Sequence, residues 1–287
     1  MKIIITGGTG FLGKRLSRKL KRNGHEIMSY DIIDGYDILN IEQMKETIIS
    51  FKPNTIIHLA ACSDLNIFAK KPEISYKINV IGTKNILNLC EKHNVRLLFA
   101  STCCAYGNNE THPTDETSPT CPTEPYAKSK KESEKDILKI GLPHCCMRLA
   151  TFYGPEMRAA LAPAVFIDKA HKKENIEIHG SGNQTRTMTY VDDIVSGIVT
   201  ITESEPKFTI INVTTEESVS VLDMIQHAKN VTGNDVKCVY IKDREGQIHK
   251  EVIHSKRLQS LGWNWKTSFE QGMRESYNFY LENKEKW

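Results

Sequence analysis

Short apolar runs alternate with amphipathic segments along the first half of the chain. Residues 3–5 form one such run, and Leu16 and Leu20 follow at helical spacing within a charged segment. The same alternation continues, with apolar runs at 25–30, 54–59 and 96–100 and helical patterns at 41–51 and 72–93. Continuous short apolar runs are typical of strands buried on both faces, so the pattern predicts an α/β fold with a doubly wound parallel sheet.

The second half of the chain is more helical. A chain of 287 residues is long enough for one large domain or two smaller ones. Helical periodicity recurs at 192–202, 218–231, 256–261 and 269–281. We expect the last three of these helices to belong to a smaller C-terminal domain, with Trp263 and Trp265 packing in its core.

A glycine-rich turn joins the first predicted strand to the first helix. Gly7, Gly10 and Gly13 have the GxxGxxG spacing of a dinucleotide-binding turn. The first glycine permits the bend, the second lets the backbone approach a pyrophosphate, and the third lets the helix pack on the strand. Because free N–H groups at a helix N-terminus favour an anion, the turn predicts a bound dinucleotide.

Asp31 ends the second predicted strand, about 20 residues beyond the glycine turn. A carboxylate at this place can accept hydrogen bonds from an adenosine ribose. A 2′-phosphate would meet like charge there, and no arginine follows to receive it, so the sequence favours NAD over NADP. The alternative is that Asp31 only caps the following turn.

Three residues further along the chain have a spacing that suits alcohol oxidation. Thr102 follows the fourth predicted strand, while Tyr126 and Lys130 lie four residues apart on one face of a predicted helix. A tyrosine of ordinary pKa needs about 4 kcal/mol to become a base near neutral pH. A lysine ammonium and an oxidised nicotinamide, each about 5 Å away, supply roughly 3 kcal/mol apiece at an effective dielectric constant of ~20. The tyrosine and lysine spacing is common by chance, but with Thr102 and the glycine turn it indicates proton removal from a substrate hydroxyl.

Composition limits the partners of the chain. The net charge of +3 is too small to indicate nucleic acid, and the basic cluster at 14–22 is explained as a solvated helix face. Apolar runs are far shorter than the ~18 residues that cross a bilayer, and Met1 leads straight into a strand, so we expect a cytoplasmic protein with no membrane partner. The eight cysteines form no CxxC pair and the ten histidines show no ligand spacing, so we predict reduced thiols and no metal.

Several other segments each match a sequence motif of one known protein family. They are HLAA at 58–61, NVIGT at 79–83, RLATFYGP at 148–155, GSGNQTR at 180–186 with YVDD at 190–193, and LGW at 261–263. With the glycine turn and the Tyr126–Lys130 spacing, they make the chain resemble the extended short-chain dehydrogenase/reductase family almost end to end. The resemblance is to its nucleotide-sugar epimerase/dehydratase branch, which includes UDP-glucose 4-epimerases.

This resemblance implies two domains with different functions. It implies a Rossmann-like NAD-binding domain at 1–150 and an interleaved C-terminal α/β substrate domain at 151–287, with 187–204 packing back on the first. It makes Thr102, Tyr126 and Lys130 catalytic. Besides Tyr126 and Lys130, the residues expected to contact NAD are Gly7, Gly10, Phe11, Leu12, Asp31, Asp37, Ile38, Leu59, Ala60, Ala61 and Asn79.

Four residues are expected to contact a nucleotide-sugar substrate: Thr151, Arg158, Arg186 and Arg244. The last two lie in loops where a guanidinium can grip a diphosphate, and each could instead be a surface arginine in a salt bridge. The family often has asparagine at position 151 and near 160, and we expect Arg158 to compensate for the loss of both.

The departures from the family pattern bear on the reaction. A 4,6-dehydratase of this family has Asp-Glu directly after the catalytic threonine, where this chain has Cys103 and Cys104. We therefore expect a 4-epimerase, in which Tyr126 removes the C4 hydroxyl proton of a nucleotide-linked hexose, NAD takes the hydride, and the 4-keto intermediate is reduced from its other face. One alternative is a dehydratase in which Cys103 or Cys104 is an acid or base, which requires a shifted thiol pKa; otherwise both merely line the pocket.

Two further alternatives are a 4-ketoreductase and a protein that binds NAD only to sense it or to present a surface. The second kind typically lacks the tyrosine or the lysine, and both are present here.

The resemblance also implies a homodimer formed through a four-helix bundle of helices near 74–93 and 123–141. The segment 108–125, rich in proline, threonine and acidic residues, is expected to be a surface flap over the site.

Overall fold

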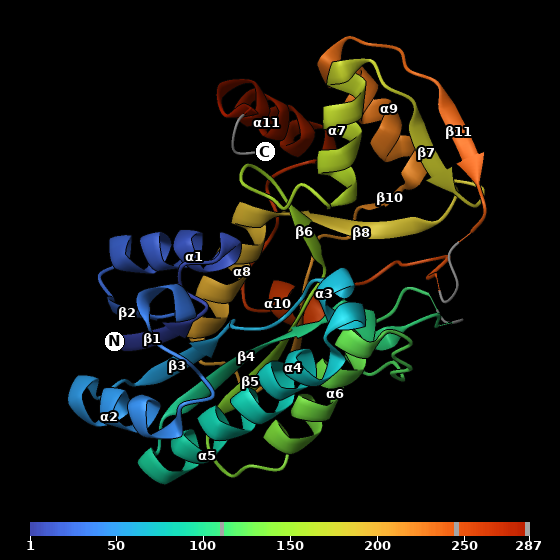
Figure 1. Cartoon of the computed structure of the whole chain (residues 1–287). Helices are drawn as coiled ribbons and strands as arrows, with labels where there is room; N and C mark the ends of the chain where they lie inside the picture. The colour runs from blue at the N-terminus through green and yellow to red at the C-terminus, as the bar shows by residue number, and fades with distance from the viewer. Residues whose placement is uncertain (110–111, 244–246, 285–287) are drawn as a thin grey trace.

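Six parallel strands form the central sheet of the computed structural model, which describes residues 1–109, 112–243 and 247–284 (Figure 1). Their order is β2-β1-β3-β4-β5-β9. The strands are β1 (Lys2–Thr6), β2 (Glu26–Tyr30), β3 (Thr55–His58), β4 (Arg96–Thr102), β5 (His144–Leu149) and β9 (Ile210–Val213). Every neighbouring pair is parallel, so the predicted doubly wound sheet is confirmed.

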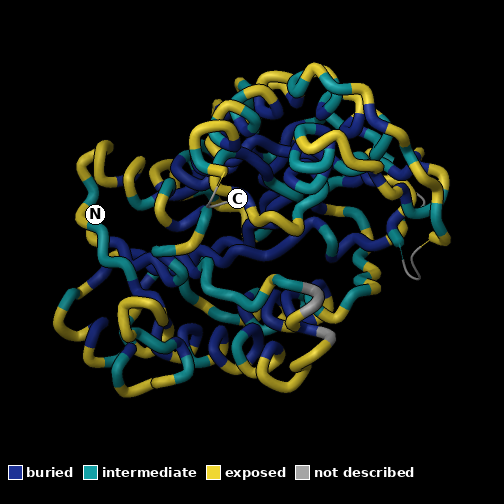
Figure 2. The backbone as a smooth tube through the Cα atoms, turned by 45° about the horizontal axis from the view of Figure 1, so that its top comes forward, coloured by how far each residue is buried: buried dark blue, intermediate teal, exposed yellow. Residues whose placement is uncertain are grey.

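Helices cover both faces of this sheet. One face packs on α1 (Phe11–Arg22) and α8 (Val191–Ser204), and the other on α2 (Ile41–Phe51), α5 (Thr83–His93) and α6 (Pro125–Ile137). Successive side chains of a strand point to opposite faces, which is why Ile3 and Ile5 join the first core and Ile4 the second. Figure 2 shows the strands as buried backbone between helices whose outer sides are exposed.

The predicted helix at 72–93 is divided into shorter pieces. Its parts are α4 (Pro72–Tyr76), the π-helical segment η2 (Lys77–Gly82) and α5, and a short helix α3 (Leu65–Lys70) precedes them. Two 3-10 turns follow strands: η1 (Ile32–Asp34) begins one residue after β2, and η3 (Cys103–Tyr106) begins directly after β4. Within the described ranges, no helix is long and apolar enough to cross a membrane.

A smaller lobe with its own core lies at the upper right in Figure 1. Its helices are α7 (Ala162–Lys172), α9 (Val221–Thr232) and α11 (Phe269–Glu282). A three-stranded sheet orders its strands as β10 (Ser218–Ser220), β8 (Thr185–Tyr190) and β6 (Thr151–Tyr153). A two-stranded parallel sheet pairs β11 (Cys238–Ile241) with β7 (Ile176–His179).

The expected place of Trp263 and of the helix near 256–261 is wrong. That helix, α10 (Lys256–Gln259), and Trp263 belong to the core of the large sheet, beside α8. Trp263 Nε1 donates to Ser196 Oγ of α8 at 2.8 Å. The chain thus returns to the large unit twice after residue 150, through α8 and β9 and again through α10 and Trp263, so one boundary at 150 does not describe the division.

The described part of the segment 108–125, expected to be a surface flap, is bonded to distant parts of the chain. Thr114 forms an isolated parallel bridge with Ile253, and Glu116 Oε1 accepts the backbone N–H of Asn212 at 2.9 Å. Asn108 is joined to the same C-terminal segment, because its Oδ1 accepts the backbone N–H of His249 at 3.0 Å. The described part of the segment is therefore a fixed wall shared between distant parts of the chain.

A buried ion pair fixes α6 to the sheet. Arg148 of β5 donates from Nε and Nη2 to the two carboxylate oxygens of Glu134, each at 2.9 Å, and Ser101 Oγ donates to Glu134 Oε1 at 2.7 Å. Burial alone would raise the pKa of Glu134, but the hydrogen bonds and charge of Arg148 hold that pKa below its ordinary value. The pair therefore sets the position of the helix that carries Tyr126 and Lys130.

Replacing Arg148 by methionine should destabilise the protein by up to about 3–5 kcal/mol, because the buried Glu134 carboxylate would lose its two-fold partner. Of the described residues, only Lys131 Nζ, at 2.8 Å, and Ser101 Oγ would still donate to it. Urea unfolding followed by circular dichroism measures this loss. Arg274→Met is the matched control, since it removes an exposed pair with Glu270 on α11 and should leave the unfolding midpoint nearly unchanged. Equal and small shifts in the two variants would contradict this role of Arg148.

Candidate active site

A cavity of about 1370 Å³ lies between the carboxyl edge of the large sheet and the smaller lobe. Its lining comes from the ends of β1, β3 and β4, the first turns of α1 and α6, and the loop between β6 and α7. Cavities that hold one drug-sized ligand usually measure about 300–1,000 Å³. This cavity therefore has room for a dinucleotide and a second ligand together.

The glycine turn lies where the strand order reverses, between β1 and β3. Open α/β sheets bind ligands at such a point. Gly7 has φ +70°, and a Cβ on it would lie 2.8 Å from the backbone nitrogen of Ala60. A Cβ on Gly13 would overlap the carbonyl oxygen of Gly7. Glycine is thus required at both positions for β1, β3 and α1 to approach this closely.

The groups around this turn fit a dinucleotide. Gly10 is the N-cap of α1 and supplies no side-chain cap, and Gly10, Phe11 and Leu12 line the cavity, so the first turn of the helix offers N–H groups to an anion. Asp31 also lines the cavity, and its carboxylate accepts the backbone N–H groups of Thr9 and Ile33, both at 3.1 Å. Each oxygen retains a lone pair, so Asp31 caps η1 and can still accept from a ribose.

The residues predicted to contact the cofactor, with one exception, line the cavity: Gly7, Gly10, Phe11, Leu12, Asp31, Asp37, Ile38, Leu59, Ala60, Ala61, Tyr126 and Lys130. The exception is Asn79, which is fully buried behind it. Asn79 Oδ1 accepts the Cys62 N–H at 2.8 Å, and its Nδ2 donates to Cys62 O and Ser129 Oγ, each at 3.0 Å. Asn79 thus holds the cavity-lining loop after β3, and its contact with the cofactor stays a prediction.

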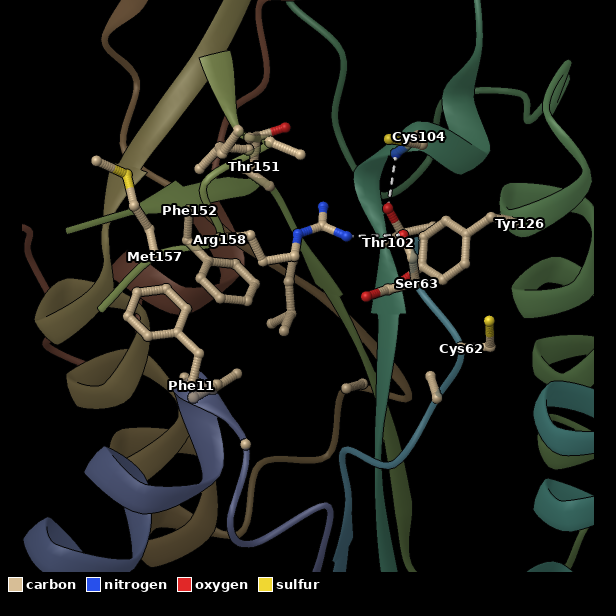
Figure 3. Close-up of a pocket in the computed structure, with 18 of the residues that line it drawn as sticks. Phe11, Cys62, Ser63, Thr102, Cys104, Tyr126, Thr151, Phe152, Met157 and Arg158 are labelled. Carbon is tan, nitrogen blue, oxygen red and sulfur yellow. Dashed lines mark hydrogen bonds between the residues drawn. The ribbon is translucent and has the colours of Figure 1, made fainter. Parts of the chain in front are cut away.

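Thr102, Tyr126 and Lys130 line the same cavity, as their places at the end of β4 and the start of α6 require. Figure 3 shows Thr102 beside the Tyr126 ring. Lys130 lies one turn further along α6, with its Nζ 4.6 Å from the centroid of the Phe99 ring. This apolar surrounding lowers the pKa of Lys130 to about 7.

Burial and the neighbouring side chains set the pKa of Tyr126 in the protein alone. Burial raises it above its ordinary value, the neighbouring Cys104 adds to the rise, and the charge of Arg158 opposes it. Because Lys130 is itself desolvated, the protein alone leaves the Tyr126 phenol protonated at neutral pH. The charge of an oxidised nicotinamide, which the sequence argument already required, must therefore provide more of the lowering than the even division assumed from sequence.

The two cysteines after Thr102 lie in different surroundings. Cys104 lines the cavity near Tyr126, and burial raises its pKa to about 11 (Figure 3). Cys103 does not line the cavity, because its Sγ donates to the Arg148 carbonyl at 3.2 Å within a small buried cluster. Of the two cysteines, only Cys104 presents its protonated thiol to the cavity, and a role of either one as acid or base stays a prediction.

The predicted substrate residues lie at separate places. Thr151, Arg158 and Arg186 line the cavity, and Arg244 lies outside the described residues. Arg186 Nη1 donates to the carbonyls of Thr185 at 2.8 Å and Ile248 at 2.7 Å, which anchors its guanidinium. Arg158 reaches across the cavity and donates to the Ser63 carbonyl at 3.3 Å, with its guanidinium directed toward Thr102 (Figure 3).

Sequence reasoning missed several polar residues of the cavity, among them Ser63, Glu124 and Gln247. Ser63 and Glu124 line it, next to the segments already singled out at 58–61 and 126–130. Gln247 lines it too, and its buried Nε2 has no hydrogen-bond partner among the described residues. Gln247 lies three positions after Arg244 in the sequence, so the segment singled out for Arg244 was the signal that could have found it.

Taken together, the fold and the site define a class. A doubly wound sheet, a glycine turn at its reversal point, and a threonine, a tyrosine and a lysine in one cavity are features of dinucleotide-dependent enzymes of the short-chain dehydrogenase/reductase type.

The chain belongs to the NAD dependent epimerase/dehydratase family, whose model matches residues 3–214. It is 30% identical over 304 residues to a putative UDP-glucose 4-epimerase of Methanocaldococcus jannaschii, covering 98% of this chain and 99% of that one. It is 27% identical to UDP-glucuronic acid decarboxylase 1 of Xenopus tropicalis, covering 99% of this chain and 73% of that protein. The resemblance predicted from the sequence is confirmed, and the family is enzymatic.

Solved structures agree with this assignment. The UDP-glucose 4-epimerase of Thermotoga maritima, solved with UDP-glucose, superposes with a TM-score of 0.91 at 28% identity and 99% coverage of both chains. The relatives nevertheless include epimerases, a decarboxylase and, at 26% identity over 100% of this chain and 90% of that protein, the dTDP-D-glucose 4,6-dehydratase of Mus musculus. Membership of the family therefore does not by itself select one reaction.

Lys130→Met should make the protein more stable near neutral pH. The folded state lowers the pKa of Lys130 from 10.5 to about 7. Between these pH values the unfolded chain therefore binds more protons than the folded protein, so the destabilisation caused by this lysine decreases as the pH rises. The advantage of the methionine variant should therefore be largest at and below about pH 7 and shrink toward about pH 9.

Thermal unfolding of both proteins across this pH range measures the difference. Lys139→Met is the control, because Lys139 is exposed and its replacement should give no pH-dependent difference from the parent protein. A difference between Lys130→Met and the parent that stays constant over the range would contradict the buried ammonium.

Proposed function

We propose that this chain is an NAD-dependent 4-epimerase of a nucleotide-linked hexose that works through a transient 4-keto intermediate. The observation that carries the proposal is the meeting of Thr102, Tyr126 and Lys130 in one cavity that holds a thiol, Cys104, near the phenol. NAD would be held by the glycine turn, Asp31 and the loop at 59–61, and when bound it supplies a reversible hydride acceptor and a positive charge.

The residues of the chain then have distinct tasks. Thr102 Oγ1 accepts the Cys104 N–H at 3.1 Å, so its own proton is free to bond a substrate oxygen and orient the C4 hydroxyl. Tyr126 removes the proton of that hydroxyl and returns it when the carbonyl is reduced. Lys130, one helical turn away, stabilises the phenolate as the charge forms. Arg158 adds a second cation near this phenol.

A dehydratase is the second candidate, and one observation favours it. Elimination of a hydroxyl needs an acid for the leaving oxygen and a base for the neighbouring proton. Cys104, with its pKa near 11, is weak in both roles at neutral pH. Glu124 is the feature in favour, since this carboxylate lines the cavity two residues before Tyr126.

Arg158 bears on the choice of sugar. Its guanidinium points toward Thr102, which orients the C4 hydroxyl in this proposal, so Arg158 meets the sugar rather than the diphosphate. A guanidinium binds a carboxylate more strongly than a neutral hydroxyl, because the hydrogen bonds to the carboxylate are charge-assisted. A hexuronate, which has a carboxylate at C6, therefore suits this end of the cavity better than a neutral hexose does.

Product analysis tests the proposed reaction. Incubation with NAD and either UDP-glucuronate or UDP-glucose should give the C4 epimer, and alkali should not develop the ultraviolet absorbance of a stable 4-keto sugar. Tyr126→Phe should lower turnover by a factor of about 100 to 10,000, the usual contribution of a general base. Cys104→Ser and Glu124→Gln should both retain epimerisation. Accumulation of a keto product, lost in Glu124→Gln, would reject the epimerase and support the dehydratase.

The predicted homodimer and cytoplasmic location stay predictions. In support of the dimer, large apolar side chains are exposed along the helical region expected to pair, including Ile74 of α4 and Ile81 of η2. Two copies that met through α4, α5 and α6 would cover these side chains, and we propose that the enzyme works as such a pair.

A further inference from the structure

A line of buried hydrogen bonds connects the strand before the glycine turn to the helix that carries Tyr126. It begins at Thr6, the last residue of β1, whose Oγ1 lies 2.6 Å from His58 Nδ1. His58 ends β3, and its Nε2 lies 2.9 Å from Thr83 Oγ1 at the start of α5. All three side chains are buried, and none of them lines the cavity.

The neighbours of this line fix the direction of each hydrogen bond. Thr83 Oγ1 donates its own proton to the Asn79 carbonyl at 2.6 Å, so it can only accept from His58, and His58 Nε2 must carry a hydrogen. Burial and the charge of Lys130 hold the pKa of His58 well below its ordinary value, so the ring is neutral. His58 Nδ1 is therefore an acceptor, and Thr6 donates to it while accepting the Ala60 N–H at 3.2 Å.

The line continues from Asn79 into α6. The Asn79 side chain donates to Ser129 Oγ, and Ser129 Oγ in turn donates to the Tyr126 carbonyl at 2.7 Å. The same side chain holds both backbone groups of Cys62. Asn79 lies within the π-helical segment η2, a kind of distortion that is frequent at functional sites. Three cavity-lining elements, the glycine turn, the loop at 59–63 and the first turn of α6, are thus joined through one network.

We propose that His58 is a positioning residue whose neutral ring, protonated on Nε2, holds the glycine turn and the loop after β3 in register with the helix that carries Tyr126. The effect on turnover rests on the proposed function, whereas the effect on cofactor binding does not. A network with every donor and acceptor satisfied has one arrangement, and such a network makes a site rigid. A displacement of about 1 Å from this arrangement is enough to lower both the affinity for the cofactor and the rate of proton transfer.

Two replacements of Thr83 separate the hydroxyl from the shape of the side chain. Thr83→Val keeps the shape but leaves the His58 Nε2–H buried without an acceptor, whereas Thr83→Ser keeps the hydroxyl. We expect Thr83→Val to weaken NADH binding about tenfold and to lower kcat more than it raises the KM for the sugar nucleotide. Thr83→Ser should bring both quantities close to those of the parent protein. Titration of NADH fluorescence measures the affinity without requiring turnover.

Thr202→Val is the matched control. Thr202 is also fully buried, and its hydroxyl donates to the carbonyl four residues back on its helix, Ile198, at 2.7 Å. It lies on α8 and does not line the cavity. Loss of the Thr202 hydroxyl should lower the melting temperature, as Thr83→Val does, but should leave the affinity for NADH unchanged.

Several outcomes separate positioning from a purely structural role. Thr83→Val with a lower melting temperature but unchanged NADH affinity and kcat would overturn the proposal. A Thr83→Ser variant that binds NADH as weakly as Thr83→Val would also overturn it. His58→Leu should resemble Thr83→Val if it folds, and the Thr83 pair gives the answer if it does not. Weaker NADH binding in Thr83→Val, in a protein that makes no epimer, would support the role of His58 and reject only the proposed reaction.

Discussion

The site depends on keeping an ammonium and a phenol together in a place with little water. Lys130 lies against the Phe99 ring, and Tyr126 precedes it by one turn of α6. Burial lowers the pKa of the lysine and raises that of the tyrosine, so in both groups it disfavours the charged form. The arrangement is therefore costly for the protein alone, and it becomes useful when a further positive charge enters the cavity.

Such a costly pair can persist only if the surrounding structure fixes it. The Glu134–Arg148 ion pair ties α6 to β5, and Ser101, next to Thr102, donates to the same carboxylate. On the cofactor side, His58 and the residues bonded to it connect the same helix to the end of β1. The His58 ring also packs on Phe99, with centroids 5.7 Å apart, so the same aromatic ring contacts both the neutral histidine and the ammonium.

Much of this arrangement follows from the sequence, because parallel strands bring their carboxyl ends to one edge. The apolar runs, Gly7 and Thr102 could be placed in that way. Periodicity shows that a segment is amphipathic but not which core it joins, and the helix near 256–261 and Trp263 were misplaced for that reason. Spacing also cannot show where a side chain points in a short 3-10 turn, which separates Cys103 from Cys104. The amount of burial, and with it the pKa of Tyr126, is a property of the assembled fold.

We infer that the Tyr126 phenol becomes a base only when a cation joins Lys130 in the cavity. Ultraviolet difference titration of the protein against its Tyr126→Phe variant, with and without NAD, measures the pKa of this one phenol. We predict an elevated pKa without NAD and a pKa near neutrality with NAD bound. A pKa of Tyr126 that stays elevated when NAD is bound would contradict the account.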